Sequence, residues 1–229
     1  MSDKGAGFVI AATGLCAEAR IAARSGSVRA VAGGGDTARL EELVRQLAAQ
    51  GGEAILSFGI AAGLAPQCSA GACLIGHEVV YQGCTYSADP AWTTSIKKLI
   101  GKADLVRIAG VDRPLVRPSE KQALHQASSA AAADMESHVV ARLAAVFALP
   151  FAVLRVIVDP AELELPPAAL AGMRADGRLD VGAVLASLVR RPRQLPGFIR
   201  LAGDAGRARA ALLHCSDLLG SRLGFHDLS

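Results

Sequence analysis

A length of 229 residues suits one α/β domain with a small helical appendage, and 52% hydrophobic against 20% charged residues excludes a disordered chain. The formal net charge of +3 is too small to indicate a nucleic-acid-binding protein, and no basic run is interleaved with aromatic residues. We therefore expect a globular domain that does not bind nucleic acid.

The cysteines and the N-terminus predict a cytoplasmic protein. Five cysteines form no CxxC pair and five histidines are scattered, so we expect reduced thiols and no metal site. The N-terminal apolar stretch is too short for the core of a signal peptide. The most apolar region, residues 139–158, contains Arg142, Pro150 and Arg155, which argues against a transmembrane helix there.

Apolar runs alternate with amphipathic segments from the N-terminus onward. Residues 8–12 predict a first strand, which a short helical piece through Glu18 and Arg20 follows. Further strands are predicted at residues 28–32, 54–58, 72–80 and 104–109, helices at residues 37–50 and 92–100, and turns or loops at residues 59–63, 81–90 and 112–119. Alternating strands and helices form βαβ units, so the pattern predicts a three-layer α/β/α sandwich around a mixed, mostly parallel sheet.

The central residues 130–159 carry the strongest pattern. Met135 and Glu136 lead into a segment whose apolar residues recur on one helix face, and Pro150 closes this helix. Residues 151–158 are an apolar run interrupted only by Arg155, as expected for a strand buried on both faces. The run ends at Asp159, and ligands of open α/β sheets bind at the carboxyl ends of the strands.

Three acidic residues stand at such positions. Glu18, Glu136 and Asp159 each follow an apolar strand or open a helix, without a basic partner close in sequence. An acid at a helix start can merely complement the helix dipole. Three acids at one edge of the same sheet favour a functional site instead.

Two glycine-containing stretches allow alternative interpretations. Gly33-x-Gly35-x-x-Ala38 follows a strand and opens a helix, as in dinucleotide-binding proteins, but no acid ends the next strand, where Ser57 lies. Two further interpretations of this stretch are a backbone nest that binds phosphate and a glycine turn that is needed only for close packing. The small residues 59–63 permit close approach of a ligand or of a helix.

The sequence resembles the nucleoside phosphorylase/nucleosidase superfamily, which includes methylthioadenosine/S-adenosylhomocysteine nucleosidases and purine nucleoside phosphorylases. The similarity covers about residues 7–190, and its specific part pairs Met135-Glu136 with Arg155-Val-Ile-x-Asp159. Supporting motifs are Gly14-Leu15-x-x-Glu18 and Gly59-x-Ala61-x-Gly63-Leu64. The stretches DMESHVVA and VDPAELELPPAAL and the basic tail look most like the hopanoid-associated branch, which is implicated in removing adenine from adenosylhopane.

This resemblance implies roles for individual residues. Asp159 would protonate the purine, Glu136 would bind the ribose hydroxyls and Glu18 would orient the nucleophile, with no cofactor and with phosphate as a co-substrate. Other residues implied in substrate binding are Met135, Ile60, Ala61 and Val158. Candidates for phosphate binding are Thr13, Gly14, Gly34 and, as the cation, Arg20. The resemblance also implies a homo-oligomer.

The chain departs from its relatives at three points. Val158 precedes Asp159 where nucleosidases usually have Ser, Ile60 replaces a hydroxyl residue, and Ser57 stands where uridine-type phosphorylases carry Arg. The branch resemblance favours phosphorolysis of adenosylhopane, whereas these departures and Glu18 favour hydrolysis by water. We expect phosphorolysis that releases adenine, with a hydrolytic methylthioadenosine/S-adenosylhomocysteine-type nucleosidase as the alternative. A dinucleotide-dependent oxidoreductase and an inactive binding protein of the same fold are the competing classes.

The C-terminal part forms a basic extension at residues 191–229, which we expect to pack on the catalytic domain of residues 1–190. Arginines alternate with apolar residues at positions 188–213. A helix with a solvated basic face explains this pattern. A peripheral contact with the inner membrane face, from which the enzyme collects a lipid-linked nucleoside, is the alternative.

Overall fold

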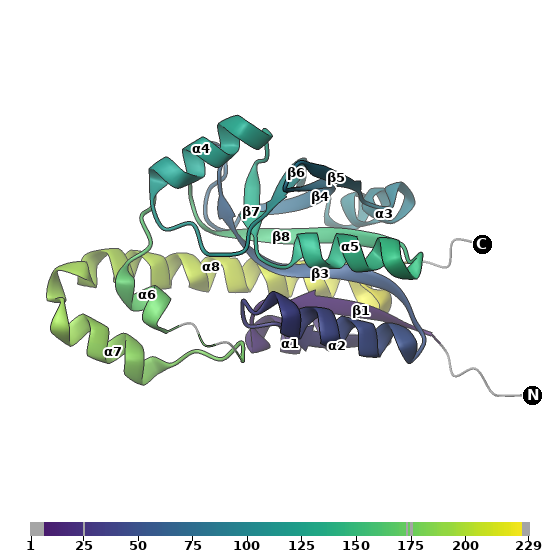
Figure 1. The fold of residues 1–229 in the computed structure, drawn as a ribbon, viewed down its shortest axis with the longest axis horizontal. Coiled ribbons are helices and arrows are strands. Elements are labelled where there is room, and N and C mark those ends of the chain that lie inside the picture. Colours follow the sequence, from purple (N-terminus) through teal and green to yellow (C-terminus); the bar gives the residue numbers. More distant parts are fainter. Residues whose placement is uncertain (1–6, 25, 173, 175, 226–229) are drawn as a thin grey trace, which may run out of the picture.

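The computed structural model describes residues 7–24, 26–172, 174 and 176–225, and the strands within this part of the chain form an eight-stranded sheet (Figure 1). The strands are β1 (Phe8–Thr13), β2 (Val28–Ala32), β3 (Gly52–Gly63), β4 (Cys73–Tyr81), β5 (Cys84–Ser87), β6 (Asp104–Gly110), β7 (Ala132–Asp134) and β8 (Phe151–Asp159). The α-helices are α1 (Cys16–Ala22), α2 (Thr37–Ala49), α3 (Pro90–Ile100), α4 (Pro118–Ser128), α5 (Ser137–Phe147), α6 (Pro167–Ala171), α7 (Val181–Arg190) and α8 (Leu195–Leu219), with short 3₁₀ helices η1 (Pro192–Gln194) and η2 (Gly220–Arg222).

The sheet is mixed and partly closed on itself. Its strand order is β2-β1-β3-β7-β6-β4-β5, and β8 pairs in parallel with β3 and antiparallel with β4. The pairings β3–β7, β7–β6, β6–β4, β4–β8 and β8–β3 therefore form a ring. Parallel pairings outnumber antiparallel ones, which confirms the predicted mixed, mostly parallel sheet.

Two hydrophobic cores cover the two faces of the sheet. Along β1, Ile10 belongs to one core and Val9 to the other, because successive side chains of a strand point to opposite faces. Leu40 and Val44 of α2 and residues of α5 complete the first core. Residues of α1, α3 and α8 complete the second. The predicted α/β/α arrangement is thus confirmed (Figure 1).

The long helix α8 is an integral layer of the fold. Ala208, Leu212, Cys215 and Leu219 recur on one face and are buried in the second core. Pro196 does not interrupt this helix, because it lies in the first turn, where its missing N–H costs no hydrogen bond. Of the described helices, none is long and apolar enough to cross a membrane.

Two predicted turns or loops are strands. The segment 59–63 continues β3, because Ile60 and Ala61 pair with β8 and the last two residues of the strand pair with β7. The predicted loop at residues 81–90 contains β5, which forms a hairpin with β4. Gln82 and Gly83 at its tip both have positive φ angles, as a two-residue hairpin turn requires.

Candidate active site

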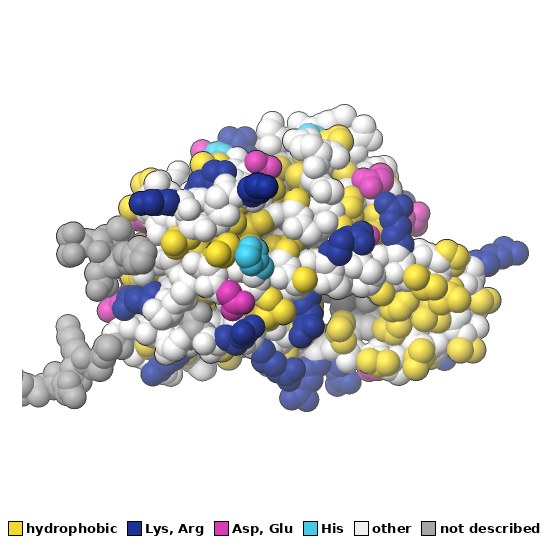
Figure 2. All heavy atoms as spheres, turned by 180° about the vertical axis from the view of Figure 1, so that it is seen from behind, with side chains coloured by type: hydrophobic (Ala, Val, Ile, Leu, Met, Phe, Trp, Pro, Cys, Tyr) yellow, Lys and Arg dark blue, Asp and Glu magenta, His cyan; other side chains and the backbone are white. Residues whose placement is uncertain are grey.

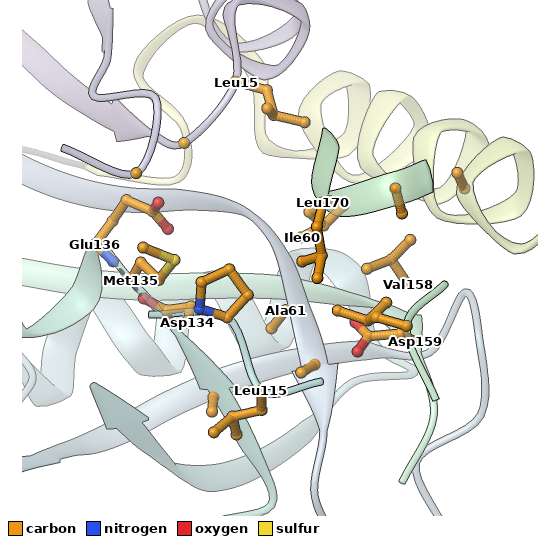
Figure 3. Close-up of a pocket in the computed structure, with 18 of the residues that line it drawn as sticks. Leu15, Ile60, Ala61, Leu115, Asp134, Met135, Glu136, Val158, Asp159 and Leu170 are labelled. Carbon is orange, nitrogen blue, oxygen red and sulfur yellow. Dashed lines mark hydrogen bonds between the residues drawn. The ribbon is translucent and has the colours of Figure 1, made fainter. Parts of the chain in front are cut away.

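A cavity of about 280 Å³ lies at the carboxyl ends of β1, β3, β7 and β8. Glu18, Glu136 and Asp159, the three acids predicted from their positions in the sequence, all line it. Figure 3 shows Asp134, Met135 and Glu136 on one side of the cavity and Val158 and Asp159 on the other, with Ile60 and Ala61 between them. The cavity thus presents carboxyl groups to a ligand from two sides.

Glu18 is held in place by backbone donors. Its Oε2 accepts hydrogen bonds from the N–H groups of Gly14 at 3.0 Å and Leu15 at 2.8 Å, and its Oε1 accepts one from Ile60 at 2.9 Å. Burial raises the pKa of Glu18, although these N–H groups and Arg155 act in the opposite direction. A carboxyl group with a raised pKa, held rigidly at a cavity wall, suits general base catalysis near neutral pH.

Glu136 belongs to a buried ion-pair network around Arg155. The guanidinium of Arg155, which is fully buried, lies 3.0 Å from Oδ2 of Asp134 and 3.3 Å from Oε2 of Glu136, and it donates to Oγ of Ser57 at 2.6 Å. Asp134 also accepts hydrogen bonds from Ser137 through its backbone N–H and its hydroxyl. The network fixes Glu136 at the start of α5, facing the cavity (Figure 3).

Ionisation in this network is finely balanced. Burial raises the pKa of Glu136 to about 8; Arg155 opposes the rise, and the neighbouring Asp134 and Glu18 add to it. Burial alone would lower the pKa of Arg155, but the surrounding carboxylates raise it, so the guanidinium stays charged. The guanidinium of Arg155 therefore interacts with several carboxyl groups at once.

Small residues allow these groups to approach one another. A Cβ atom on Gly14 would lie 2.7 Å from Oε1 of Glu136. A Cβ atom on Gly59 would lie 2.8 Å from Nη1 of Arg155 and 2.9 Å from Cδ of Glu18. Glycine at these two positions therefore leaves room for the charged groups of the site, and Gly59 also has a φ angle of +156°, which other residues rarely adopt.

Asp159 forms an ion pair that its sequence position did not predict. Nζ of Lys121, a fully buried residue of α4, lies 2.8 Å from its Oδ2. Burial raises the pKa of Asp159 to about 6, against the opposing effect of Lys121. At this pKa a substantial fraction of Asp159 is protonated in mildly acidic solution, as a proton donor requires.

The remaining wall is apolar. Met135, Ile60, Ala61 and Val158, to which the family resemblance gives a role in substrate binding, line the cavity. Sequence reasoning missed a second group of lining residues from the loops and from α6 and α8, namely Leu15, Val111, Pro114, Leu115, Leu165, Ala169, Leu170, Leu179, Leu201 and Ala205. Their only signal was the apolar character of segments read as loops or tail. They make the cavity suitable for a ligand with a large apolar part.

Only some of the predicted phosphate-binding residues line the cavity. Gly14 and Gly34 line the cavity, but the N–H of Gly14 is bonded to Glu18 and the N–H of Gly34 to the carbonyl of Gly14. The hydroxyl of Thr13 donates to the carbonyl of Val31 at 2.9 Å, and Thr13 is not among the lining residues.

The cation predicted for phosphate binding, Arg20, does not lie at the cavity. Arg20 is exposed on α1 and does not line the cavity. Arg174 is the arginine that lines it, and this residue also lies 3.3 Å from Oδ2 of Asp180.

The glycine stretch before α2 does not present a free helix N-terminus. Gly34 and Gly35 line the cavity, but Asp36 caps α2 by accepting a hydrogen bond from the N–H of Arg39 at 3.0 Å. A carboxylate at this position disfavours the pyrophosphate of a dinucleotide, which would otherwise bind there.

Solved structures share this fold across nearly their full length. A futalosine hydrolase of Helicobacter pylori strain 26695 matches with a TM-score of 0.62 and 17% identity, over 80% of this chain and 97% of that one. A 5′-methylthioadenosine/S-adenosylhomocysteine nucleosidase of H. pylori matches with a TM-score of 0.67 and 15% identity, over 93% and 99%. The corresponding nucleosidase of S. pneumoniae has a TM-score of 0.68 and 14% identity, over 94% and 99%.

No curated protein matches the chain at a significant level. The sequence profile of the phosphorylase superfamily matches residues 12–190, which is most of the chain. This chain therefore belongs to the phosphorylase superfamily.

Proposed function

We propose that the protein cleaves the N-glycosidic bond of an adenine nucleoside. The observation that carries this proposal is the convergence of Glu18, Glu136 and Asp159 on one cavity from two sides. Cleavage of this bond leaves negative charge on the base and positive charge on the sugar, so it needs a proton donor at the base and carboxylates at the sugar. The superfamily and the names of its structural neighbours, which are nucleosidases and a hydrolase, support the same reaction.

We assign Asp159 to the base and Glu136 to the sugar. Asp159, with its raised pKa, transfers a proton to a ring nitrogen of the purine while the electrons of the glycosidic bond pass to the base. Glu136 lies on the other side of the cavity and binds the ribose hydroxyls. Met135 packs beside it against the sugar. The base leaves neutral, and Asp159 is left as a carboxylate.

Water is the nucleophile that the contacts of Glu18 favour. The N–H groups of Gly14 and Gly34 and the hydroxyl of Thr13 are already bonded within the protein, so they do not form a free anion cradle. A phosphate dianion would also be repelled by Glu18 in the ionised form that a general base requires. Water bound to Glu18 can instead add to the anomeric carbon and give its proton to this carboxylate.

Phosphorolysis is the second candidate, because Arg174 lines the cavity and the resemblance to the hopanoid-associated branch favours phosphate.

The test that distinguishes the two nucleophiles is adenine release from adenosine and its 5′-alkyl derivatives, with and without phosphate, followed by chromatography of the sugar. We expect equal rates in both buffers and a free ribose product. Glu18→Gln is expected to lower the rate ~10²–10⁴-fold, with the surface variant Glu42→Gln as control. Release that requires phosphate and gives the sugar 1-phosphate would make Arg174 the binding cation and refute hydrolysis.

The substrate proposed from the apolar wall is a nucleoside with a large apolar 5′ group, and adenosylhopane is the candidate that the branch resemblance implies. Leu165, Leu170 and Leu201 line the cavity together with Leu179. Leu179 is at the same time 64% exposed, so the lining continues to the surface. A long apolar substituent can leave the cavity by this route.

We also propose a peripheral membrane contact around this opening. Figure 2 shows hydrophobic side chains gathered at the end of the molecule formed by α6, α7 and the start of α8. Those exposed there are Leu179, Val181, Leu185, Val189, Leu195 and Ile199, and the exposed arginines beside them in sequence are Arg190, Arg191, Arg193 and Arg200. An anionic bilayer complements this surface, whereas two copies pairing through it would bring arginines together. The rest of α8 packs one face in the core, and its other face is exposed but carries arginines such as Arg209 in place of a cluster of large apolar side chains.

Co-sedimentation with phosphatidylglycerol vesicles tests this contact. We expect binding at low salt that weakens as salt is added, and roughly a tenfold loss of binding for Val189→Asp, whose side chain is 82% exposed on α7. Val146→Asp on α5, 64% exposed in the wild type, is the matched control and is expected to bind normally. Absence of binding at low salt, or an equal loss for both variants, would count against the membrane contact.

A further inference from the structure

Lys121 is buried beside Asp159, the proposed proton donor, and has no role in the reaction as described above. Its side chain is fully buried, although lysine is almost never found so unless it is paired. Nζ donates to the backbone carbonyls of Pro160 at 2.8 Å, Leu163 at 2.9 Å and Asp159 at 3.3 Å, and lies 2.8 Å from the carboxylate of Asp159. These contacts tie α4 to the segment that follows β8.

The contacts also define what Lys121 can do. An ammonium group has three N–H donors, and the surrounding carbonyl and carboxylate oxygens are sufficient to engage all of them. Lys121 does not line the cavity. It therefore acts on a substrate only through Asp159.

We propose that Lys121 is a positioning residue for the cleavage reaction: its ammonium fixes the carboxyl group of Asp159 at the cavity wall and stabilises the carboxylate that forms when the proton passes to the base. This inference rests on the proposed function of Asp159. In the step, the proton moves from Asp159 to the purine and the glycosidic electron pair moves to the base. The sugar carbon gains water, whose proton goes to Glu18. Negative charge develops on Asp159, 2.8 Å from a cation that is already in place.

Other charges around Asp159 do not replace this effect. Asp204 of α8, which is buried and paired with Arg207, acts in the opposite direction by raising the pKa of Asp159. Among the described groups that shift the pKa of Asp159, Lys121 is the one that lowers it as a cation. The lysine thus makes Asp159 the stronger acid.

The test is the pH dependence of adenine release by Lys121→Met. Activity needs protonated Asp159, so the rate falls as the pH rises through its pKa. Without the cation this limb is expected to move upward by ~1–3 pH units, and the maximal rate is expected to fall. A merely structural lysine would lower the rate at every pH without moving the limb, and that result would overturn the proposal.

The double variant Lys121→Met/Asp159→Asn keeps the test independent of activity. Removing both partners leaves neither charge unpaired, so the double variant is expected to unfold at a higher denaturant concentration than Lys121→Met alone. If the double variant is no more stable than Lys121→Met, or if the effects of Lys121→Met and Asp159→Asn on stability simply add, Lys121 does not act through Asp159 and the proposal is wrong. If the wild type releases no adenine, the proposed function fails, and this coupling still reports on the pair.

Discussion

Asp159→Asn is expected to fold and to release adenine ~10²–10⁴-fold more slowly than the wild type, because asparagine cannot give a proton to the departing base. The substitution also leaves Lys121 without the carboxylate that lies 2.8 Å from its Nζ. Some loss of stability is therefore expected as well. Rates must be compared at equal concentrations of folded protein, measured by circular dichroism and active-site-independent fluorescence of Trp92.

The matched control is Glu162→Gln, an acid-to-amide change three residues further along the chain. Glu162 is exposed, its partner Arg200 lies 3.4 Å away, and it does not line the cavity of the proposed site. This variant is expected to keep the activity of the wild type. If Asp159→Asn remained within about threefold of the wild type, Asp159 would not be the general acid.

The positions of the three acids could be predicted because each depends on a local pattern. Asp159 ends an apolar run, Glu136 precedes an amphipathic helix, and Glu18 lies in the first turn after β1. In a largely parallel sheet such positions fall at the same edge, so strand assignment alone brings Glu18 and Asp159 together, whereas the short strand β7 before Glu136 was not predicted. The same patterns predicted the two-faced sheet and most of its strands.

Lys121 could not be predicted, because its partner lies 38 residues away in the chain. No local pattern distinguishes a lysine that will be buried from the many that remain solvated. The hydroxyl pair Ser57 and Ser137, whose Oγ atoms are 3.0 Å apart beside Arg155, was missed for the same reason. Such contacts follow from tertiary packing and not from periodicity.

The errors at β3 and β5 have a different origin. Small residues such as Gly59 and Gly63 are typical of turns, so the strand was predicted to end before them. Pairing with two neighbouring strands overrides this preference, and Glu18 and Arg155 of the site need Gly59 for space. β5 has only four residues, three of them polar or exposed, and forms through its hairpin with β4.

Arg155→Met is expected to cause the largest loss of stability. The guanidinium is fully buried and serves Asp134 and Glu136, with Glu18 nearby. Removing one partner from a buried ion pair typically costs about 3–5 kcal/mol, because the other charges remain without compensation. For a chain of this size the expected decrease in the melting temperature is ~6–20 °C. Differential scanning calorimetry measures it directly.

Arg142→Met provides the matched control. Arg142 lies on α5 and pairs with Glu41 at 3.2 Å, but its side chain is 44% exposed. A solvated pair of this kind contributes ~0–1 kcal/mol, so this variant should unfold within a few degrees of the wild type. Similar melting temperatures for the two variants would show that Arg155 does not hold the acids in the folded state.

The pH dependence of the Arg155→Met defect distinguishes electrostatics from packing. Burial already raises the pKa of Glu136 to about 8, and loss of Arg155 removes an opposing effect, so this pKa rises further in the folded variant. An acid whose folded-state pKa exceeds its unfolded value favours folding below the unfolded pKa, and this contribution is lost as the pH rises through the folded pKa. The part of the defect that comes from Glu136 should therefore be small near pH 5, where Glu136 is protonated, and should grow toward and above pH 8. A defect that is constant over this range would instead come from the lost packing and the lost pairing with Asp134, and Glu136 would then not depend on Arg155 for its charge.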